Sequence, residues 1–551
     1  MKAVVRIRSF LAVPVLGVFF LSGLSLSLAQ TRLDGVVVSD HDAAVRAGMG
    51  ILEQGGNAVD AAVATAFALA VVDPASSGLG GGGVMVLYQA REKKAHVLDF
   101  TEVSPAAVAP ELYRNGGGVR RDLLETGDLA VAVPGTVAGL AEALKRFGSL
   151  PLETVLAPAV RHAAEGFPAT RRLRRAIEEN LPALRQRANF SRIFLKESGK
   201  PREVGEMIRQ PELAETLKTI AREGAGAFYE GAIGQALAAR IKNLTLDDLN
   251  SYKPVWRGPI IGSYRDRAVI TAPPPSLGGL ALAGMLRVME GYGPDQFRHN
   301  SGAYLHLVAE TAKAGAADLL KHAGEPDFGE AAQRLISRER ASALRNEISM
   351  DLAARRSGVM PVAAAGGQGG TSHIGVLDGD GNAVSMSLAI GSSFGSKVLV
   401  RETGVILNNQ MCQFWVPESS AGNALATLKP RRRPVNRMTP AILLRDDRPV
   451  LIVGASGGAR TTGAVLQTIL NVLDFRMPLT EAVAAPRLHV PTGGAQVVEL
   501  EPAVSDEAAA GLAGKGHTVL RAPTLGEVQA IRVEGKRITG ASDPRGAGAT
   551  R

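Results

Sequence analysis

The stretch GGTSHIGVLDGDGNAVSMSLA, Gly369–Ala389, carries the pattern that decides the fold. Apolar residues alternate with small or polar ones on both sides of a turn, at Ile374, Val376, Val384, Met386 and Leu388. A period of two is typical of a strand with one buried face. The turn DGDGN, residues 378–382, is rich in the residues that tight turns favour. The stretch therefore predicts a β-hairpin that starts close to Thr371.

Elements on both sides of this hairpin indicate the fold class. Further strands are predicted after it at Val405–Leu407, Ala441–Leu444 and Val450–Val453. Residues 150–350, before it, are mostly helical by pattern, with amphipathic stretches at Arg171–Arg187 and Leu213–Arg222. A helix-rich first part and a strand-rich second part fit packed sheets flanked by helices. Residues 362–370 are rich in Ala, Gly and Gln without a pattern, and we interpret them as a flexible segment.

Two helices and a glycine-rich turn are predicted near the start of the chain. A helical pattern over Ala43–Leu52 breaks at a Gly-Gly pair, and Asn57 then caps a second helix, Ala58–Val71. This second helix is apolar nearly all round, so we expect it to be buried. Gly78–Gly83 matches the GxGxxG pattern, but a helix precedes it and a strand-like run follows, which reverses the order in a dinucleotide site. We predict a turn that lines a pocket, and no bound nucleotide.

The N-terminus has the pattern of an export signal. Lys2, Arg6 and Arg8 form a basic start, Ser9–Ala29 is uncharged, and Ser27-Leu28-Ala29 supplies the small residues that cleavage needs. We expect residues 1–29 to be a signal peptide and the mature protein to be periplasmic or secreted, without stable membrane insertion. The alternative is a retained anchor, because the uncharged run is long enough to span a bilayer.

Charge and composition argue against several classes of partner. The formal net charge is +9, but the basic residues are dispersed except at Arg431–Arg433 and Arg437, and only 4% of residues are aromatic. Nucleic-acid binding normally needs a basic stripe with stacking aromatics, so we expect no such partner. Cys412 is the one cysteine, which leaves no internal disulfide, and its default interpretation is a small buried residue. The nine histidines form no HExxH pair, so we predict neither a metal nor another cofactor.

Thr371 follows two glycines at the junction between the patternless segment and the hairpin. If the Gly370–Thr371 bond is cut, Thr371 gains a free α-amine, whose pKa of about 7.7–8.0 suits a base near neutral pH. A threonine with its own amine as base is an activated nucleophile. Glycine at 370 lets the hydroxyl reach the preceding carbonyl without a Cβ clash. On these residues alone, an ordinary loop that enters a strand is the alternative.

Several motifs in register decide between these alternatives, because together they resemble the γ-glutamyltranspeptidase (glutathione hydrolase) family. The matching stretches are Gly55–Ala64, Leu79–Gly83, Pro134–Gly139, Pro273–Gly279, His306–Glu310, Thr371–His373, Asp380–Val384, Gly404–Met411, Gly457–Arg460 and Gly540–Arg545. The resemblance extends from about residue 35 to 545 and is specific because so many motifs keep their order.

This resemblance implies a four-layer αββα sandwich of the N-terminal-nucleophile hydrolase class. It implies one precursor cut before Thr371, with a large chain, 30–370, and a small chain, 371–551, that stay associated as one intertwined domain. It also implies acyl transfer from a small-molecule amide of γ-glutamyl type, through an acyl-threonine that water or an amine resolves. Family analogy places Gly457 and Gly458 at the oxyanion hole, and Asn409 and Gln410 at the substrate.

The resemblance fails in the site that would bind the glutamyl group. Thr101 stands where the family has an arginine for the α-carboxylate, and Asn436-Arg437 replace two serines that also bind it. Gln413 replaces an acid that holds the α-ammonium. Arg437 could supply a substitute cation for a substrate carboxylate, or it could be a solvated member of the basic cluster. Without an acid at 413, we expect a weaker preference for a free glutamyl amino group.

A second departure lies beside the nucleophile. The family's helper threonine corresponds to Ala389, and a nearby asparagine corresponds to Gly391. Ser387 lies two residues back on the same strand face, roughly 6.5 Å away, so it cannot take over the helper's hydrogen bond. The expected function is therefore a γ-glutamyltransferase- or glutathione-hydrolase-like enzyme with an altered glutamate site. The alternatives are a cephalosporin-acylase-like enzyme for non-glutamyl amides and a catalytically inactive binding homologue.

Overall fold

The structure is a computed structural model that describes residues 35–116, 118–322, 328–355, 370–416, 426–491 and 496–551. The predicted signal peptide and nearly all of the predicted flexible segment lie outside these residues. Within them, no helix combines the length and the apolar character that a membrane crossing requires.

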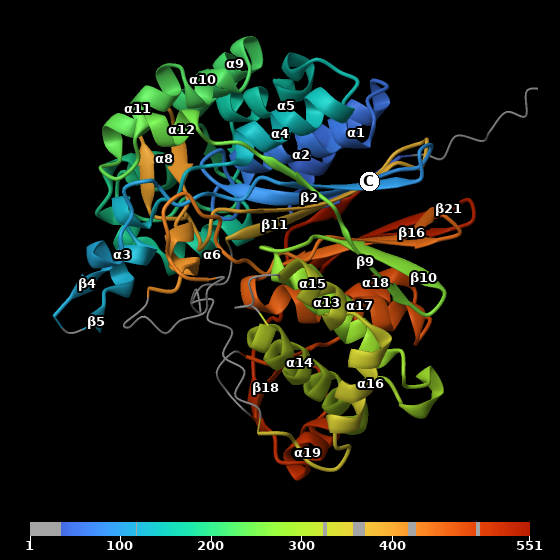
Figure 1. Cartoon of the computed structure of the whole chain (residues 1–551). Coiled ribbons are helices and arrows are strands. Elements are labelled where there is room, and N and C mark those ends of the chain that lie inside the picture. The colour runs from blue at the N-terminus through green and yellow to red at the C-terminus, as the bar shows by residue number, and fades with distance from the viewer. Residues whose placement is uncertain (1–34, 117, 323–327, 356–369, 417–425, 492–495) are drawn as a thin grey trace, which may run out of the picture. The chain divides into compact units, whose positions relative to one another are not determined.

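Two antiparallel sheets form the centre of the fold (Figure 1). The first has seven strands in the order β22 (Ala549–Thr550), β1 (Val36–Ser39), β11 (Thr371–Leu377), β12 (Ala383–Ala389), β2 (Gly82–Gln89), β3 (Lys94–Asp99) and β8 (Val255–Arg257). The predicted hairpin is confirmed as β11 and β12, and β11 begins at Thr371. Strands β1 and β2, both from the N-terminal part of the chain, flank this hairpin, so the first sheet depends on long-range pairing.

The second sheet has six strands in the order β21 (Arg537–Ser542), β20 (Glu527–Glu534), β16 (Arg448–Ser456), β15 (Ala441–Arg445), β10 (Arg267–Thr271) and β9 (Ile260–Tyr264). The strands predicted near 441 and 450 are thereby confirmed. Residues 150–350 are mostly helical, as predicted, but strands β9 and β10, which the pattern did not predict, lie among the helices. Their β-branched residues lie in runs of only five, each too short to stand out within a long helical region.

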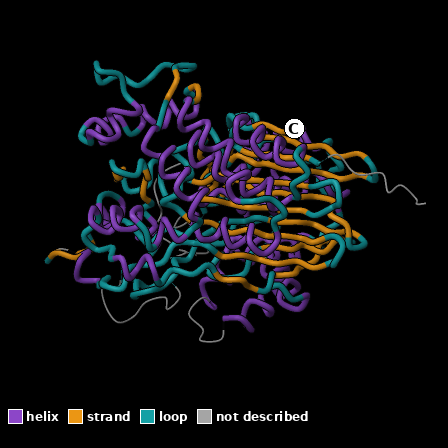
Figure 2. The backbone as a smooth tube through the Cα atoms, turned by 90° about the horizontal axis from the view of Figure 1, so that it is seen from above, coloured by secondary structure: helices purple, strands orange, loops and turns teal. Residues whose placement is uncertain are grey.

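Helices cover the outer face of each sheet, so the predicted four-layer αββα sandwich is confirmed (Figures 1 and 2). The layer over the first sheet contains α1 (Asp42–Glu53), α2 (Ala58–Val72), α4 (Thr136–Phe147), α5 (Leu152–Glu165) and α9 (Pro211–Glu223). The layer under the second sheet contains α13 (Leu277–Met289), α14 (Gly302–His322), α15 (Phe328–Leu335), α16 (Arg338–Glu347), α17 (Thr461–Leu473), α18 (Leu479–Ala484) and α19 (Asp506–Gly514).

Shorter elements complete the described chain. The remaining helices are α3 (Arg121–Glu125), α6 (Arg171–Glu179), α7 (Leu181–Arg185), α8 (Ala188–Phe194), α10 (Gly226–Tyr229), α11 (Ala232–Arg240) and α12 (Leu246–Asn250). The remaining strands are β4 (Arg114–Asn115), β5 (Gly118–Val119), β6 (Phe167–Pro168), β7 (Met207–Ile208), β13 (Val398–Val400), β14 (Val405–Leu407), β17 (Leu488–His489), β18 (Val497–Leu500) and β19 (Thr518–Arg521). Single 3-10 turns lie at Pro110–Tyr113, Asp128–Ala130, Pro294–Gln296, Gln410–Gln413 and Gly458–Arg460.

Helix α2 is the central helix of the first layer. Its predicted capping box is confirmed: the Asn57 side chain accepts from the Asp60 N–H, and the Asp60 carboxylate accepts from the Asn57 N–H at 2.8 Å. The same carboxylate accepts from the Ser149 N–H, which ties α2 to the end of α4. Every residue of α2 is buried, which its all-round apolar sequence predicted. The glycine-rich turn after α2 leads into β2, so it has the reversed order that argues against a nucleotide site.

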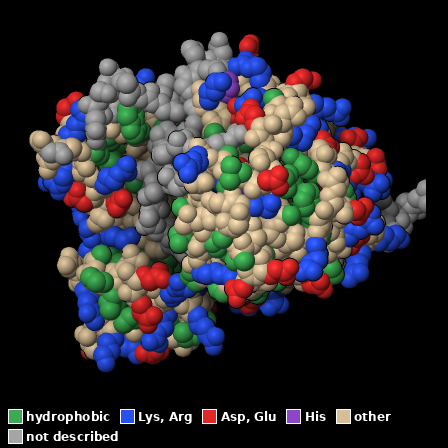
Figure 3. Space-filling view, turned by 90° about the horizontal axis from the view of Figure 1, so that it is seen from below, with side chains coloured by type: hydrophobic (Ala, Val, Ile, Leu, Met, Phe, Trp, Pro, Cys, Tyr) green, Lys and Arg blue, Asp and Glu red, His purple; other side chains and the backbone are tan. Residues whose placement is uncertain are grey.

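The surface agrees with the dispersed charge in the sequence. Figure 3 shows one face of the molecule, where acidic and basic side chains are interspersed and apolar ones occur in small groups. Among the described residues of this face, the basic side chains form no continuous stripe of the kind that a nucleic-acid backbone needs.

The complete burial of α2 generates a prediction about its small residues. Ala64 is 0% exposed, and a leucine there would have to displace closely packed neighbours. We predict that Ala64→Leu lowers the free energy of unfolding by about 1–3 kcal/mol in chemical denaturation. Ala239→Leu, at an exposed position of α11, is the matched control and should change it by no more than about 0.5 kcal/mol. Equal effects of the two substitutions would contradict this account of the core.

Candidate active site

Thr371 is the first residue of β11 and is half-buried. It lies directly opposite Ala389 of β12, which in turn lies opposite Gly82 of β2. The carbonyl of Gly370 accepts from the Ile390 N–H at 3.0 Å, so the chain is fixed on both sides of the 370–371 bond. A Cβ at Gly370 would lie 1.7 Å from the Gly391 carbonyl oxygen. Only glycine fits immediately before Thr371.

Contacts between the two sheets show what Thr371 faces. The ring of His373 lies against Gly454 of β16, where a Cβ would come within 2.1 Å of it. A Cβ on Gly375 would meet the Ile452 side chain at 3.6 Å. Each step of two residues forward along β11 therefore matches a step of two residues back along β16. One further step in the same register places Thr371 opposite Ser456, which is the residue before Gly457. The side chain of Thr371 then points toward the space between the sheets.

A polar layer follows Thr371 along this inner face. His373 is fully buried, and its Nδ1 and Nε2 lie 3.0 Å from Ser387 Oγ and 3.3 Å from Ser385 Oγ. Burial lowers the pKa of His373 to about 3, so the ring is neutral at physiological pH. Ser387 lies opposite His373, two residue pairs beyond the pair of Thr371 and Ala389, as its spacing predicted. Its hydroxyl is therefore engaged with His373 and does not replace the helper that Ala389 lacks.

Asp40 connects the two strands at the Thr371 end. Its Oδ2 accepts from the His373 N–H at 2.5 Å, and its Oδ1 accepts from Ser456 Oγ at 3.4 Å and Gln529 Nε2 at 3.1 Å. Arg172 lies 3.6 Å away and also pairs with Asp73 and Glu527. Burial raises the pKa of Asp40 to about 7, against the opposing charge of Arg172. Sequence reasoning missed Asp40, because its hydrogen-bond partners His373, Ser456 and Gln529 are more than 300 residues away in the chain.

Gly457 and Gly458 follow β16 in the left-handed region, with φ of 122° and 60°. A Cβ on Gly457 would lie 2.8 Å from Gly526 Cα, so this glycine is required by close packing. A Cβ on Gly458 would have no neighbour within 4 Å, so the space beside it is open. Neither N–H group is a donor in any turn, loop or side-chain hydrogen bond of the described chain. Two free N–H groups near Thr371 suit the predicted oxyanion hole.

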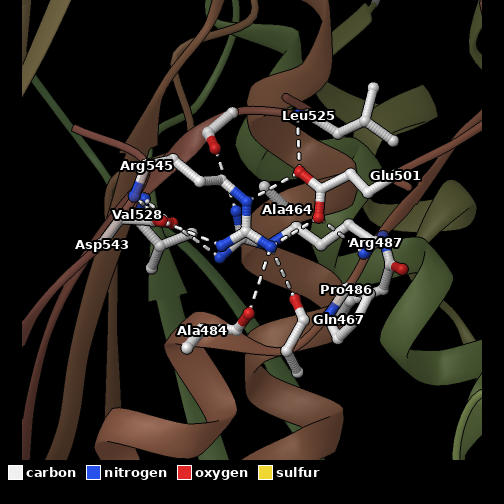
Figure 4. A network of polar contacts seen from close by, with 12 residues as sticks. Ala464, Gln467, Ala484, Pro486, Arg487, Glu501, Leu525, Val528, Asp543 and Arg545 are labelled. Carbon is white, nitrogen blue, oxygen red and sulfur yellow. Dashed lines mark hydrogen bonds and ion pairs between the residues drawn. The ribbon is translucent and has the colours of Figure 1, made fainter. Parts of the chain in front are cut away.

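A buried ionic network holds the loop that packs against Gly457 (Figure 4). Arg487 donates to Asp543 Oδ2 at 2.7 Å and to the Gly526 carbonyl at 2.9 Å. Arg545 donates to Asp543 Oδ1 at 2.9 Å and to both oxygens of Glu501, and Glu501 accepts from the Leu525 N–H. The network therefore fixes the position of Gly526, and through it the position of Gly457. This gives the Asp543-Pro544-Arg545 motif a structural role.

Asn409 is buried, and its side-chain amide is fully engaged. Its Oδ1 accepts from the Ser392 N–H at 2.8 Å, and its Nδ2 donates to the Glu125 carbonyl and Ser392 Oγ, each at 2.9 Å. A Cβ on Gly391 would lie 1.9 Å from Asn409 Oδ1. The Asn409 amide thus occupies the space that a larger residue at 391 would need. Its predicted role at the substrate remains a prediction.

Thr101 is buried and has an internal partner. Its hydroxyl donates to Asp99 at 2.6 Å. The guanidinium of Arg433, which sequence reasoning did not single out, donates to the Thr101 carbonyl and lies 3.6 Å from Asp99. A positive charge therefore remains near position 101, where Arg433 shares the Asp99 carboxylate with Arg257, whose Nε lies 2.8 Å from it. Glu102, the next residue, is fully buried, and burial raises its pKa to about 8.

The turn Gln410–Gln413 carries two further predicted substrate residues. Gln410 is buried, whereas Gln413 is half-buried and lies beside Cys412, with Nε2 at 3.7 Å from Sγ. Cys412 is buried, as expected, and burial raises the pKa of its thiol to about 12. Within the described chain no acidic side chain bonds to Gln413, so the structure brings no replacement for the family's acid to this position.

Asn436 and Arg437 lie between the two sheets and the second helical layer. Asn436 Oδ1 accepts from Ser276 Oγ at 2.8 Å and from the Met438 N–H at 3.0 Å. Met438 joins the cluster between the sheets that contains Ala389. Arg437 lines a cavity on the helical side, and its Nε is buried without a partner in the described chain. Arg437 as a whole is half-buried, so it is not a fully solvated member of the basic cluster.

One group of side chains in the described residues has the composition of a metal site. His306, Glu310 and His517 offer ligand atoms within 4.8 Å of one another. The ammonium of Lys313 lies 2.8 Å from Glu310 and 3.4 Å from His517, so the chain already supplies a positive charge there. Sequence reasoning missed this group because His517 is distant in the chain.

The ionic network behind the oxyanion loop generates a stability prediction. Asp543 is 0% exposed, and its removal leaves Arg487 buried without its partner. We predict that Asp543→Ala lowers the free energy of unfolding by about 3–5 kcal/mol. Asp247→Ala, which breaks the exposed pair with Arg431, should cost no more than about 1 kcal/mol. Similar losses for both variants in urea denaturation would contradict the structural role of the network.

The raised pKa of Asp40 generates a prediction about pH. An ordinary aspartate ionises near pH 4, so between pH about 4 and about 7 the unfolded chain releases this proton while the folded chain keeps it. Ionisation of Asp40 therefore lowers stability as pH rises through this window. We predict that Asp40→Asn reduces the fall in melting temperature between pH 5 and 8, whereas the exposed control Asp247→Asn leaves it as in the wild type. An unchanged fall in Asp40→Asn would show that Asp40 ionises normally.

Comparisons with known proteins agree with this geometry. The family model described as gamma-glutamyltranspeptidase matches residues 44–551. A glutathione hydrolase proenzyme of Pseudomonas aeruginosa is 35% identical over 560 residues, which cover 97% of each chain. The Acylase ACY 1 proenzyme of a Pseudomonas species is 37% identical over 503 residues, covering 89% of this chain and 88% of the relative. The crystal structure of a cephalosporin acylase from Bacillus halodurans is similar with a TM-score of 0.84 and 29% identity, over 94% of this chain and 96% of that one. This chain is an enzyme that belongs to the gamma-glutamyltranspeptidase family.

Proposed function

We propose that the chain cuts itself between Gly370 and Thr371 and then uses Thr371 to transfer or hydrolyse the acyl group of an amide. The observation that carries the proposal is the position of Thr371. This residue begins β11 opposite the end of β16, where the chain continues into Gly457 and Gly458. A nucleophile and unpaired N–H donors at one end of the sandwich are what amide attack requires. The cut would give chains 30–370 and 371–551. They would remain associated because the small chain's hairpin of β11 and β12 pairs on one side with β1 and on the other with β2, both of the large chain.

The first step is intramolecular. The Thr371 hydroxyl oxygen attacks the Gly370 carbonyl carbon, the C–N bond breaks, and the hydroxyl proton passes to the departing nitrogen. The product is an ester between Gly370 and Thr371 Oγ. Water then opens this ester, which leaves a carboxylate on Gly370 and both a free amine and a hydroxyl on Thr371. The tight fit of Gly370 against Gly391 holds the reacting carbonyl beside the attacking group.

Turnover uses the groups that this cut releases. The α-amine of Thr371 takes the hydroxyl proton while the oxygen attacks the substrate carbonyl. The N–H groups of Gly457 and Gly458 stabilise the negative oxygen of the tetrahedral intermediate. The amine then gives its proton to the leaving group, and water or an acceptor amine resolves the acyl-threonine. With Ala389 opposite Thr371, no helper hydroxyl assists from that position.

The substrate is a small-molecule amide with an acyl group of γ-glutamyl type. Relatives named glutathione hydrolase and relatives named acylase have nearly the same identity to this chain, so the names alone do not separate the two classes. Gln413 favours an acyl group without a free amino group, because a neutral amide compensates an ammonium poorly. We propose that the enzyme works in the periplasm or outside the cell, where the predicted signal peptide would direct it.

The nucleophile is tested by replacing its hydroxyl. We predict that Thr371→Ala abolishes both self-cleavage and turnover, whereas Thr371→Ser, which keeps a hydroxyl, retains both at a reduced rate. Self-cleavage is read from a denaturing gel followed by N-terminal sequencing, and turnover is read from p-nitroaniline release. A wild-type chain that stays uncut on incubation, as Thr371→Ala does, would favour the inactive binding homologue.

A further inference from the structure

The first residues of β11 direct their backbone groups alternately to two sides. The Gly370 carbonyl accepts from an N–H just after β12, so Gly370 and every second residue after it face β12. The N–H groups of Thr371 and His373 therefore point the other way, toward β1. Strand β1 ends one residue pair short of His373, and beyond its end the Asp40 carboxylate accepts from the His373 N–H. The nitrogen of Thr371 consequently points to the edge of the sheet where Asp40 lies.

Three carboxylates surround a single guanidinium at this edge. Arg172 of α6 lies 3.6 Å from Asp40, which follows β1, and 3.7 Å from Asp73, which follows α2. It also pairs with Glu527 at the start of β20. Burial raises the pKa of Asp40 to about 7 although Arg172 opposes the rise, and the charges of Glu527 and Asp73 add to it. When all four groups are ionised, three negative charges face one positive charge, so the cluster favours a further cation.

Asp73 is the carboxylate of this cluster that a new cation meets with the fewest strong competitors. Its Oδ2 accepts from Ser372 Oγ at 3.4 Å, and its contact with Arg172 is also long. The oxygens of Asp40, by contrast, accept from a backbone N–H and from two side chains. One residue of a strand spans about 3.3 Å, so the Thr371 nitrogen is a single such step from the residue that Asp73 contacts.

A cavity of about 540 Å³ joins the cluster to the oxyanion loop. Its lining includes Ser456 and Gly457 at the end of β16, and Arg172 and Glu527 of the cluster. The carboxylates and the predicted oxyanion donor of Gly457 therefore border the same space. An amine released at Thr371 has room there to turn toward a carboxylate.

We propose that the cut makes the Thr371 α-amine a member of this cluster, with Asp73 as the counter-ion of its ammonium form and Arg172 as the residue that positions Asp73. When the amine takes the Thr371 hydroxyl proton during turnover, the positive charge forms beside an excess of negative charge. A neighbouring carboxylate raises the pKa of an ammonium, so Asp73 sets the pH at which the amine becomes a free base. This inference rests on the proposed function, because the amine exists only after the cut.

Most other described ionisable groups around the start of β11 are neutral or paired near neutral pH. Burial lowers the pKa of His41 to about 4 and that of His373 to about 3, so both rings are neutral. Arg460 pairs with an acid of β18 at 3.1 Å. The remaining pairs on these elements are Asp42 with Arg46 and Arg551, Arg175 with Glu179, and Asp543 with Arg487 and Arg545.

Lys397, in the turn after β12, is the exception. Its ammonium donates to carbonyl groups of its own turn, and burial lowers its pKa to about 8. Lys397 therefore titrates in the same range as an ordinary α-amine. The test has to read the Thr371 nitrogen itself.

The test removes one negative charge and measures the proton affinity of the α-amine. Acetic anhydride labels the neutral amine, and mass spectrometry of the peptide that begins at Thr371 separates this label from that on Lys397. We predict that Asp73→Asn lowers the midpoint of labelling against pH by about 1 unit, as expected for the loss of a neighbouring opposite charge. The acid limb of kcat/KM for glutaryl-p-nitroanilide should move to lower pH with it, because more of the amine is then a free base.

Asp318→Asn is the matched control, because Asp318 is also buried and paired with an arginine, in the second helical layer. It should leave the midpoint as in the wild type. Glu527→Gln removes a more exposed carboxylate of the cluster and should lower the midpoint by less. An equal shift in Asp318→Asn would overturn the inference. A slower Asp73→Asn enzyme with an unchanged midpoint would also overturn it, because Asp73 would then only support the fold. If Asp73→Asn does not fold, an unchanged midpoint in Glu527→Gln overturns it.

Self-cleavage separates this inference from the proposed function. A wild-type chain that stays uncut has no α-amine at Thr371 and overturns both. A cut and active chain whose Thr371 amine titrates alike in the wild type and in Asp73→Asn keeps the proposed function and overturns the inference alone. If the cut chain does not turn over the anilide, the labelling midpoint still decides whether Asp73 is the counter-ion.

Discussion

The packing of β11 against β16 is the contact on which the rest of the site depends. The two strands belong to different sheets and run in opposite directions, with His373 against Gly454 and Gly375 against Ile452. This register brings the start of β11, with Thr371, to the end of β16, where Gly457 and Gly458 begin. A strand shifted by one residue would turn Thr371 to the opposite face of its sheet. The reacting groups are therefore aligned by the core of the sandwich.

Buried charges fix this alignment at both strands. Asp40 joins the His373 N–H to the Ser456 hydroxyl, and Arg172 balances part of its charge. Behind the oxyanion loop, Arg487, Asp543 and Arg545 hold Gly526 against Gly457 (Figure 4). Such networks are costly to bury, but once their hydrogen bonds are satisfied they favour one arrangement. They account for charged residues that lie near the site without facing the substrate.

Much of the fold could be predicted from the sequence, because its signals are local. The hairpin followed from the period of two around DGDGN, and the cap of α2 followed from Asn57 and Asp60. Strands β9 and β10 were missed because each has only five residues within a helical region. Thr371 and the glycine pair could be proposed from the motifs. Asp40, Arg433 and the place of Arg437 could not, because each depends on partners brought together only by the two sheets.

Trapping the acyl-enzyme tests the central claim most directly. The mature protein is mixed with glutaryl-p-nitroanilide, quenched in acid within the first turnovers, digested and analysed by mass spectrometry. The account predicts a glutaryl adduct on a peptide that begins at Thr371, with the ester on its side chain. An adduct on another residue, or turnover by a chain in which Thr371 is still joined to Gly370, would contradict it.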